Sequence, residues 1–381
     1  MMYDLIKHAF PKDAAEHAFW VFPRSWRVHI TWKYRREIKN LARINTELST
    51  RPDPAYAKRI DSFWIKHYGK TVNKAWHAAY ASINGLKDER YIPKDILYAE
   101  ILPRLNRREL ANAYEDKNRY AVNLEGAQLP VTLVKNINGD YYRDEISRPI
   151  PRQSAFEHLT AHEGCAIIKP SLNSGGGKRV KKLFIHSGEI FKEGERVSFE
   201  ALEADYGKDF IIQAEIEQHS AIRGVHSSSV NTLRLTTFRF HGEIHLLSTM
   251  VRFGNGGSVI DNLSAGGLIC GVDEAGHLNK CAFDKYGQEH ERHPFSGYAF
   301  QEILIPKIDA FSEQAVFLHH QLPYFDLVSW DFAIGPHAEP ILVELNLGGV
   351  HTVYQIVNGP LFGSFTEELL EDIRDGHYIS V

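Results

Sequence analysis

Cysteine and methionine are scarce in this chain of 381 residues, which contains three of each. Cys165, Cys270 and Cys281 lack the spacing of a zinc site or of a disulfide framework, so we expect structural thiols in a reducing compartment. No run of roughly eighteen consecutive apolar residues occurs, and the first residues lack the apolar core of a signal peptide. We therefore expect a soluble, cytoplasmic protein with no integral membrane segment.

An excess of charge of either sign is also missing. The chain has 44 Lys and Arg against 48 Asp and Glu, which gives a net charge of −4 and an isoelectric point near 6.6. Proteins that bind nucleic acid usually carry a basic face, so this balance predicts no nucleic-acid partner. With 43% hydrophobic and 24% charged residues, the composition is that of a globular protein large enough for two or three domains.

Residues 1–90 are rich in aromatic side chains at helical spacing. Tyr56, Ile60, Trp64 and Tyr68 follow one another in steps of four, which favours an amphipathic helix that contributes to a core or to a homodimer contact. An earlier segment gathers cations on a predicted helix, namely Lys33, Arg35, Arg36, Lys39 and Arg43. This positive face is either a solvated helix surface or a docking site for an anionic surface or partner.

After residue 90 the segments become shorter and alternate between apolar runs and turns. Asn138, Gly139 and Asp140 form a turn signal between two strand-like pieces, as in a hairpin. Further strand-like runs and helices expected at residues 301–318 and 365–374 complete the pattern. The sequence therefore predicts an α/β (α+β) protein.

Two apolar runs within residues 329–346 carry oxygen side chains where hydrophobic residues are expected. Asp331 interrupts the first run, and Glu344 and Asn346 end the second two residues apart, so that the pleat points both toward one face. A buried, unpartnered carboxylate costs several kcal/mol, and a divalent cation would offset that cost. Three hard oxygen ligands suit magnesium. Alternatively, Asp331 caps a turn and the other two residues mark an exposed strand end.

A glycine-rich segment follows the short apolar strand that ends at Lys169. Its candidate phosphate-binding residues are Ser174, Gly175, Gly176, Gly177 and Lys178. Glycines let backbone N–H groups approach anions closely, although an ordinary hairpin tip would have the same composition. Lys169 either meets an anion at the end of its strand or extends to the surface.

Two strands expected to pair in antiparallel fashion bring Arg234 and Arg252 into the same layer. Guanidinium groups held in a sheet keep their charge and either bind anions or form structural salt bridges. The segment around Gln213 and Glu215 alternates apolar and polar residues, which fits contacts to adenine and ribose or an edge strand with a polar face. Substrate contacts are assigned to Asn231 and to a polar, glycine-rich loop with Asp261, Asn262, Gly266 and Gly267.

In their order along the chain, these segments resemble the ATP-grasp superfamily. AIIKPSLNSGGG, SVNTLR, MVRFG, DNLSAGG, HPFSG, SWDFAI and LVELN together resemble the sugar-transfer-associated ATP-grasp family, over about residues 105–346. The resemblance implies that Lys117 and Lys169 touch ATP phosphates and that Gln213, Ala214, Glu215 and Ile216 form the adenine-binding hinge. It places Arg234 and Arg252 near the γ-phosphate, and it makes Asp331, Glu344 and Asn346 the ligands of Mg²⁺.

The resemblance also implies an ATP-grasp fold with an α-helical N-terminal extension. The expected division is a helical N-terminal region at 1–90, a linker with a small α/β subdomain at 91–160, a lid subdomain at 161–220 and a C-terminal catalytic subdomain at 221–381. The helical opening departs from the βαβ pattern that usually precedes the ATP-grasp domain. The site of the acceptor substrate is therefore left unassigned.

The activity that the resemblance implies is ATP- and magnesium-dependent ligation of a carboxylate to an amine or a thiol through an acylphosphate. The substrate would be a small molecule or a sugar-linked acceptor in surface-polysaccharide or sugar-conjugate biosynthesis. One alternative is an ATP-grasp kinase that phosphorylates a sugar or polyol hydroxyl. A second is a non-catalytic ATP-binding scaffold.

Overall fold

The computed structural model describes residues 23–143, 147–172, 174, 177, 179–258, 260–348 and 353–377, with side chains described from Trp26 onward. The chain divides into two compact units. The helical unit comprises residues 1–105 and 359–381, and the sheet unit comprises residues 106–358. In the part of the chain that the structure describes, no helix is long and apolar enough to cross a membrane.

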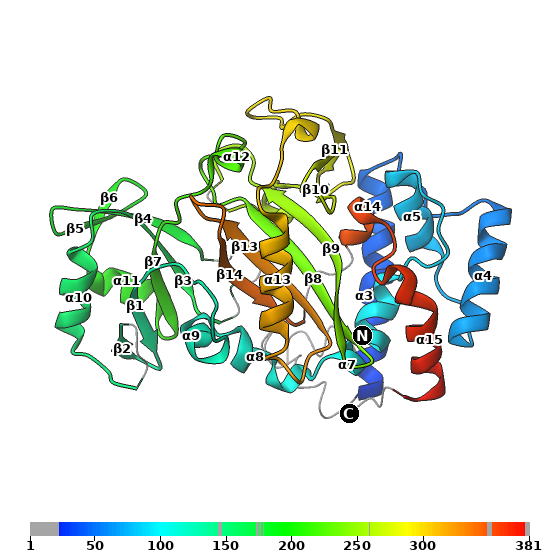
Figure 1. Cartoon of the computed structure of the whole chain (residues 1–381), viewed down its shortest axis with the longest axis horizontal. Coiled ribbons are helices and arrows are strands. Elements are labelled where there is room, and N and C mark those ends of the chain that lie inside the picture. Colours follow the sequence, from blue (N-terminus) through cyan, green and yellow to red (C-terminus); the bar gives the residue numbers. More distant parts are fainter. Residues whose placement is uncertain are drawn as a thin grey trace, which may run out of the picture. The chain divides into compact units, whose positions relative to one another are not determined.

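The helical unit is built from helices of both chain ends (Figure 1). They are α3 (Pro23–Ile44), α4 (Pro54–Tyr68), α5 (Ala75–Asn84), α6 (Lys94–Ile96), the π-helical η1 (Leu97–Ile101), α7 (Leu102–Leu105), the 3₁₀ turn η6 (Gly363–Phe365) and α15 (Thr366–Asp375). Helix α15 packs against α4, and α3 packs against α5, α6 and η1. The helix expected at residues 365–374 is confirmed by α15.

Residues at both ends of helix α4 explain where this helix begins and ends. Asp53 accepts a hydrogen bond from the Tyr56 backbone N–H at 2.9 Å, and Gly69 ends the helix with a φ of 80°. The predicted aromatic face is confirmed, since Tyr56, Ile60, Trp64 and Tyr68 are all buried. Apolar residues at steps of four cover one side of a helix, and here that side forms the core of the unit.

The sheet unit contains two antiparallel sheets. The first has the order β2-β1-β7-β3-β4-β5-β6. Its strands are β1 (Thr132–Ile137), β2 (Asp140–Tyr142), β3 (Gly164–Pro170), β4 (Lys181–His186), β5 (Glu189–Lys192), β6 (Glu195–Val197) and β7 (Phe210–Ala214). Helices α10 (Arg152–Thr160) and α11 (Phe199–Tyr206) contribute Ala155, Leu159, Phe199 and Leu202 to the core beneath this sheet.

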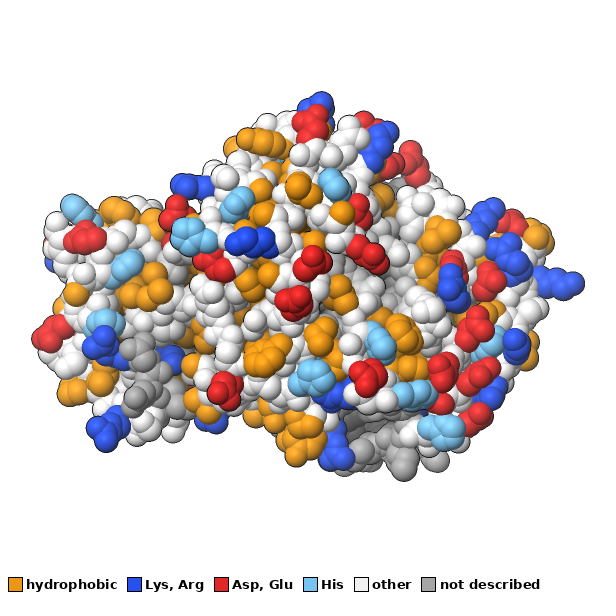
Figure 2. Space-filling view, viewed as in Figure 1, with side chains coloured by type: hydrophobic (Ala, Val, Ile, Leu, Met, Phe, Trp, Pro, Cys, Tyr) orange, Lys and Arg blue, Asp and Glu red, His pale blue; other side chains and the backbone are white. Residues whose placement is uncertain are grey.

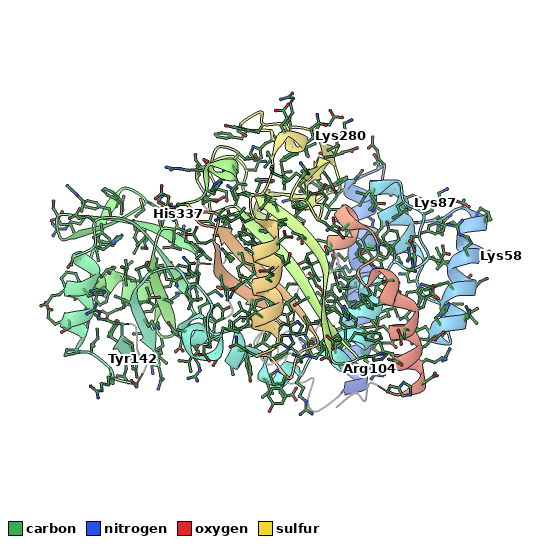
Figure 3. The ribbon with its side chains drawn as sticks, viewed as in Figure 1. Lys58, Lys87, Arg104, Tyr142, Lys280 and His337 are labelled. Atoms are coloured by element: carbon green, nitrogen blue, oxygen red, sulfur yellow. The ribbon has the colours of Figure 1, made fainter. Side chains whose placement is uncertain are left out.

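The predicted hairpin in this first sheet is confirmed. Strands β1 and β2 pair across the turn, where Asn138 and Gly139 have φ angles of 54° and 99°. Positive φ at both central positions gives the tight turn whose twist matches that of the flanking strands. Tyr142, marked in Figure 3, lies at the end of β2.

The second sheet has the order β12-β11-β10-β9-β8-β13-β14. Its strands are β8 (Thr232–Phe240), β9 (Glu243–Phe253), β10 (Leu268–Val272), β11 (Leu278–Phe283), β12 (Glu289–His290), β13 (Leu327–Ile334) and β14 (Pro340–Asn346). Helix α13 (Ile308–His319) crosses one face and contacts β8, β9, β13 and β14 (Figure 1). Leu233, Leu235, Trp330 and Phe332 form the apolar core on the α13 side.

The prediction of a helix at residues 301–318 was wrong about where the helix begins. Phe300–Glu302 forms only the 3₁₀ turn η5, and α13 begins at Ile308. Pro306 explains the difference, because its ring disfavours helical backbone in the residue before it and it has no N–H to donate.

Short helical segments connect the strands of the sheet unit. They are α8 (Arg108–Glu115), η2 (Lys117–Arg119), α9 (Tyr120–Asn123), α12 (Ser220–Arg223), η4 (Leu263–Ala265) and α14 (Tyr354–Asn358). Alternation along β8 and β13 turns Thr232, Arg234, Thr236, Ser329 and Asp331 away from the apolar α13 side, which leaves a polar face on the second sheet.

Candidate active site

The polar face of the second sheet brings three charged residues of neighbouring strands into register. Asp331 on β13 lies opposite Arg234 on β8 and opposite Glu344 on β14. Directly opposite residues of antiparallel strands point to the same face. Between β13 and β14 the register shifts after Asp331, so Val343 is an extra residue that forms a β-bulge beside Glu344. Bulges redirect side chains, and here both Val343 and Glu344 line the same pocket.

Arg234 and Asp331 form a buried, bidentate ion pair. Arg234 Nε donates to Asp331 Oδ1 and Nη2 donates to Oδ2, both at 2.5 Å. Asp331 is fully buried and Arg234 is 4% exposed. Burial by itself would raise the pKa of Asp331, but the charges of Arg234 and Arg252 outweigh burial and lower the pKa. Asp331 is therefore ionised in this site.

Arg252 lies at the centre of a second group of contacts. Its Nη2 is 3.2 Å from Asp331 Oδ2 and 3.3 Å from Asp261 Oδ1, its Nε donates to Thr232 Oγ1 at 2.9 Å, and its Nη1 donates to Asn262 Oδ1 at 3.3 Å. The Thr232 hydroxyl in turn donates to Asp261. Burial raises the pKa of Asp261, although Arg252 opposes that rise. The loop that carries Asp261 and Asn262 is thus tied to the sheet through Arg252 and Thr232.

Lys117 and Glu344 form a third ion pair, with 2.7 Å between Lys117 Nζ and Glu344 Oε1. Burial would raise the pKa of Glu344, but Lys117 and, more weakly, Lys169 lower it. The segment that carries Lys117 is fastened to β14 and its continuation. Leu345 N donates to the Tyr120 hydroxyl at 3.2 Å, and Leu347 N donates to Glu115 at 2.6 Å. The chain around Lys117 is thereby held beside Glu344.

Lys169 is the one member of the cluster with no carboxylate partner among the described residues. It is the last residue but one of β3, is 7% exposed and makes no ion pair within the described part of the chain. Burial, followed by repulsion from Lys117, lowers its pKa to about 8.

A pocket opens beside this cluster, between the two sheets. Of the residues predicted from the sequence, its walls contain Lys117, Lys169, Ser174, Gly177, Gln213, Ala214, Glu215, Ile216, Arg252, Asp261, Asn262, Asp331 and Glu344. The candidate phosphate-binding, hinge and carboxylate residues therefore share one cavity, although they are spread over more than two hundred positions of the chain.

Other predicted residues lie behind or beside the walls. Arg234 contacts Asp331 from behind, and Asn346 Nδ2 donates to Asp331 Oδ2 at 3.3 Å. Neither lines the pocket. Gly175, Gly176 and Lys178 lie outside the described residues. Their roles in nucleotide binding, like the roles of all these residues, stay predictions.

Three residues predicted to contact substrate are also absent from the pocket walls. Asn231 is fully buried, and its side-chain amide donates to Gln218 Oε1 and to the carbonyls of Ile222 and His226. Gly266 has a φ of 94°, and a Cβ on Gly267 would lie 2.4 Å from the Asp261 carbonyl oxygen. Asn231 thus holds the segment at residues 218–226, and Gly267 lies against the backbone at Asp261, while the predicted substrate contacts of all three residues stay predictions.

The sequence reasoning did not single out several residues of the pocket wall. They include Ile167, Val180, Thr232, Ile260 and Val343. Apolar side chains at these positions look like ordinary strand or loop residues in a sequence, and only their placement around a cavity distinguishes them. Lys182 was also missed, although its position in the strand that follows the glycine-rich segment was a usable signal.

Lys182 forms an ion pair with Glu215 at the pocket wall, with 2.6 Å between Nζ and Oε1. The Glu215 backbone N–H donates to the Cys165 carbonyl at 3.0 Å, which continues the pairing of β7 with β3 beyond Ala214. The predicted hinge segment is thus hydrogen-bonded to β3 at the point where it lines the pocket.

Only a few side chains with oxygen atoms in the described part of the chain are placed where they could bind a metal ion at the pocket. Among the described residues, no group of three or more His, Cys, Asp or Glu side chains could hold a metal ion. Asp331 and Glu344 supply two carboxylates in register, and Asn346 adds an amide that already contacts Asp331. Such a set fits Mg²⁺, which keeps several water or phosphate oxygens as ligands and needs few from the protein.

Comparison with known proteins identifies a family. The model of the family described as sugar-transfer associated ATP-grasp matches residues 97–369. None of the curated proteins compared matches the chain significantly in sequence.

Solved structures with a similar fold include the L-amino acid ligase from Bacillus licheniformis, with 13% identity, a TM-score of 0.36 and coverage of 68% of this chain and 47% of that chain. VanG D-Ala:D-Ser ligase from Enterococcus faecalis has 13% identity, a TM-score of 0.38 and coverage of 70% and 62%. The biotin carboxylase domain of the Hydrogenobacter thermophilus 2-oxoglutarate carboxylase, solved with MgADP, ADP and bicarbonate, has 10% identity, a TM-score of 0.39 and coverage of 70% and 46%. The chain spans between about half and three fifths of these proteins.

Proposed function

The chain belongs to the sugar-transfer-associated ATP-grasp family, and on that premise we propose that it is an ATP- and magnesium-dependent ligase that joins a carboxylate to an amine or a thiol. The proposed substrate is a small molecule or a sugar-linked acceptor in the synthesis of a polysaccharide or sugar conjugate, and the proposed location is the cytoplasm. ATP is the proposed nucleotide, bound in the pocket between the two sheets.

One observation carries the proposal. Lys117, Lys169 and Arg252 line the same pocket as Asp331 and Glu344, and Lys169 keeps a buried positive charge without a carboxylate partner in the described part of the chain. Burying an unpaired cation is unfavourable, so a protein gains nothing in stability from this arrangement. A triphosphate would provide the missing anion and would offset the unfavourable burial.

Asp331, Glu344 and Asn346 are the proposed ligands of Mg²⁺. When bound there, Mg²⁺ supplies positive charge next to the transferring phosphoryl group and fixes the orientation of the phosphates. Asp331 and Glu344 already face the pocket as ionised groups, and their charges are neutralised by Arg234, Arg252 and Lys117 in the free protein.

In the proposed reaction, a carboxylate oxygen of the acceptor attacks the γ-phosphorus and the bond from that phosphorus to the ADP oxygen breaks. An amine then attacks the carbonyl carbon of the acylphosphate, inorganic phosphate leaves, and the amine nitrogen releases a proton. Lys117, Lys169 and Arg252 contribute by stabilising negative charge on the phosphoryl oxygens. None of these steps needs a side-chain nucleophile.

The test compares Glu344→Ala and Asp331→Asn with a control variant, Glu217→Gln, whose side chain is 71% exposed and outside the pocket. MgATP binding is measured by calorimetry, and ADP and phosphate are measured with panels of carboxylates and amines. We expect both site variants to lose ATP turnover by at least about a hundredfold, with the control unchanged. Full turnover in the two site variants would refute the assignment, and phosphate retained on a hydroxyl product would indicate the kinase.

A further inference from the structure

Ser229 and His226 form a hydrogen-bonded pair at the wall of the pocket. Ser229 Oγ lies 2.9 Å from His226 Nδ1, and His226 Nε2 lies 2.8 Å from the Gly256 carbonyl oxygen. A carbonyl oxygen only accepts hydrogen bonds, so in the neutral ring Nε2 carries the hydrogen and Nδ1 accepts from the Ser229 hydroxyl. Ser229 lines the pocket, and His226 lies behind it. Figure 2 shows several histidine side chains at the surface of the molecule, whereas His226 is 2% exposed.

The pair lies close to the part of the pocket formed by Arg252, where the γ-phosphate is expected. A Cβ on Gly254, two positions after Arg252, would lie 2.3 Å from Ser229 Oγ and 2.5 Å from His226 Nδ1. Ser229 also precedes Thr232 by three residues, which span at most about 11 Å, and the Thr232 hydroxyl accepts a hydrogen bond from Arg252 Nε. The missing side chain of Gly254 therefore leaves the space that the pair occupies beside Arg252.

Two buried amide side chains hold the backbone of the pair. Gln218 Nε2 donates to the Ser229 carbonyl at 2.9 Å, and Asn231 Nδ2 donates to the His226 carbonyl at 2.9 Å. The Asn231 backbone N–H in turn donates to Gln218 Oε1 at 2.7 Å. Supporting hydrogen bonds of this kind keep reactive side chains in a fixed geometry before a substrate binds.

A second serine and histidine form the same hydrogen bonds away from the pocket. His293 Nε2 lies 2.8 Å from the Gly254 carbonyl oxygen, and His293 Nδ1 lies 3.1 Å from Ser296 Oγ. His293 is buried, as His226 is, but Ser296 is exposed and does not line the pocket. A serine three residues after a histidine can thus simply fix a turn. The position of Ser229 at the pocket wall is what distinguishes the first pair.

The proposed ligation needs a group that takes the proton of the attacking amine. Every carboxylate of the described pocket wall already pairs with a cation, namely Glu215 with Lys182, Glu344 with Lys117, Asp261 with Arg252 and Asp331 with Arg252. The described residues of this wall include no histidine. A base can also act through one intervening hydrogen-bonded group, and His226 is a base placed one hydroxyl behind the wall.

We propose that Ser229 and His226 form a proton relay for the amine, an inference that rests on the proposed ligase activity. The amine nitrogen bonds to the carbonyl carbon of the acylphosphate, and the bond from that carbon to the phosphate oxygen breaks. A proton of the nitrogen passes to Ser229 Oγ while the Ser229 hydroxyl proton passes to His226 Nδ1. The Gly256 carbonyl stabilises the imidazolium through Nε2–H, and the proton later returns through Ser229 to water.

The test separates formation of the acylphosphate from its capture by an amine. The full chain is given MgATP, one of the carboxylates D-glucuronate, D-lactate and succinate, and either hydroxylamine or one of the amines glycinamide, glucosamine and ethanolamine. Hydroxylamine reacts with acylphosphates in free solution, so the hydroxamate reports the first step without help from the relay. The variants are His226→Gln and Ser229→Ala, and the controls His293→Gln and Ser296→Ala remove the matching groups of the second pair.

We expect His226→Gln and Ser229→Ala to lose at least about a hundredfold in kcat for amide formation while hydroxamate formation stays at the wild-type rate. Both controls should retain both products. Ser229→Ala removes a single oxygen, which guards against a folding defect in His226→Gln. Equal loss of amide and hydroxamate in both variants, unchanged amide formation, or wild-type hydroxamate without an amide from any amine would overturn the relay. Absence of ADP with every carboxylate in the wild type would instead refute the ligase activity on which the relay rests.

Discussion

Arg234 and Asp331 face each other across β8 and β13 and exchange two hydrogen bonds in the interior of the sheet unit. This pairing holds a carboxylate ionised in a place where burial alone would protonate it. Arg234 does not line the pocket, whereas Asp331 does. Arg234 thus positions the Asp331 carboxylate without lining the pocket itself. Loss of this ion pair should therefore affect both the stability of the sheet and the activity expected at the pocket.

Breaking this pair should destabilise the protein. Arg234→Met leaves Asp331 with Arg252 as its remaining cation, and loss of one partner of a buried pair typically costs about 3–5 kcal/mol. The double variant Arg234→Met, Asp331→Leu removes both charges and should recover much of that free energy of unfolding in a urea titration. ATP turnover should be lost in both variants. Equal destabilisation of the single and double variants would show that the ion pair is not the source of the effect.

Replacing Lys169 should stabilise the free protein but weaken its binding of MgATP. Its positive charge is buried without a carboxylate partner among the described residues, and burial lowers its pKa to about 8, which corresponds to a cost of roughly 3 kcal/mol at neutral pH. Lys169→Met should therefore raise the thermal midpoint of the free protein while weakening MgATP binding by at least about tenfold. Differential scanning calorimetry and titration calorimetry measure the two effects. A variant that is both less stable and able to bind MgATP normally would contradict the interpretation.

Gly177 should be intolerant of even a methyl group. It has a φ of 72°, and a Cβ there would lie 2.6 Å from Ile260 Cδ1 and 2.9 Å from Asn262 Nδ2, whereas Gly188 has a φ of 78° and open space around a Cβ. Gly188→Ala therefore reports the backbone strain alone. Gly177→Ala should weaken MgATP binding well beyond Gly188→Ala, and Ile260→Val, which removes Cδ1, should partly restore it. Equal effects of the two glycine variants would exclude the contact with the Ile260 loop as the cause.

His319 should make the protein sensitive to acid. Burial lowers its pKa to about 3, and its ring is held between the Thr237 hydroxyl at 2.7 Å and the Phe325 carbonyl at 2.8 Å. The unfolded chain binds a proton near pH 6.5 and the folded chain does not, so stability falls as the pH drops from 6.5 toward 3. This group contributes a loss of about 2 kcal/mol by about pH 5.

Urea unfolding at several pH values tests this dependence. His319→Asn should be less stable near neutral pH but should show a flatter decline with acid. The matched control is His337→Asn in the exposed turn between β13 and β14, marked in Figure 3, which should leave the decline unchanged. An unaltered slope in His319→Asn would assign the acid sensitivity to other groups.

Much of the site could be predicted because its charged residues sit in strands that are otherwise apolar. Asp331, Glu344, Lys169 and the two arginines each break a hydrophobic run, and such breaks are unfavourable unless a partner or ligand compensates them. Apolar wall residues such as Ile167 and Ile260 carry no comparable signal. Gly266 has a positive φ and the Gly267 backbone lies close to the Asp261 carbonyl, so both glycines have a backbone role in the loop, and their predicted contacts to substrate stay predictions.

By itself, the sequence determined local structure and residue chemistry: the positive face of α3, the amphipathic face of α4, the turn at Asn138 and Gly139, and which strands carry charge. The pairing of those charges depended on the tertiary structure. Lys117 meets Glu344 across 227 positions, and Arg234 meets Asp331 across 97. Periodicity assigns a side chain to a face, but only the register between distant strands selects its partner. The same limit applies to Lys169. Only the tertiary structure shows that the described carboxylates around it, Glu344 and Asp331, already pair with other cations.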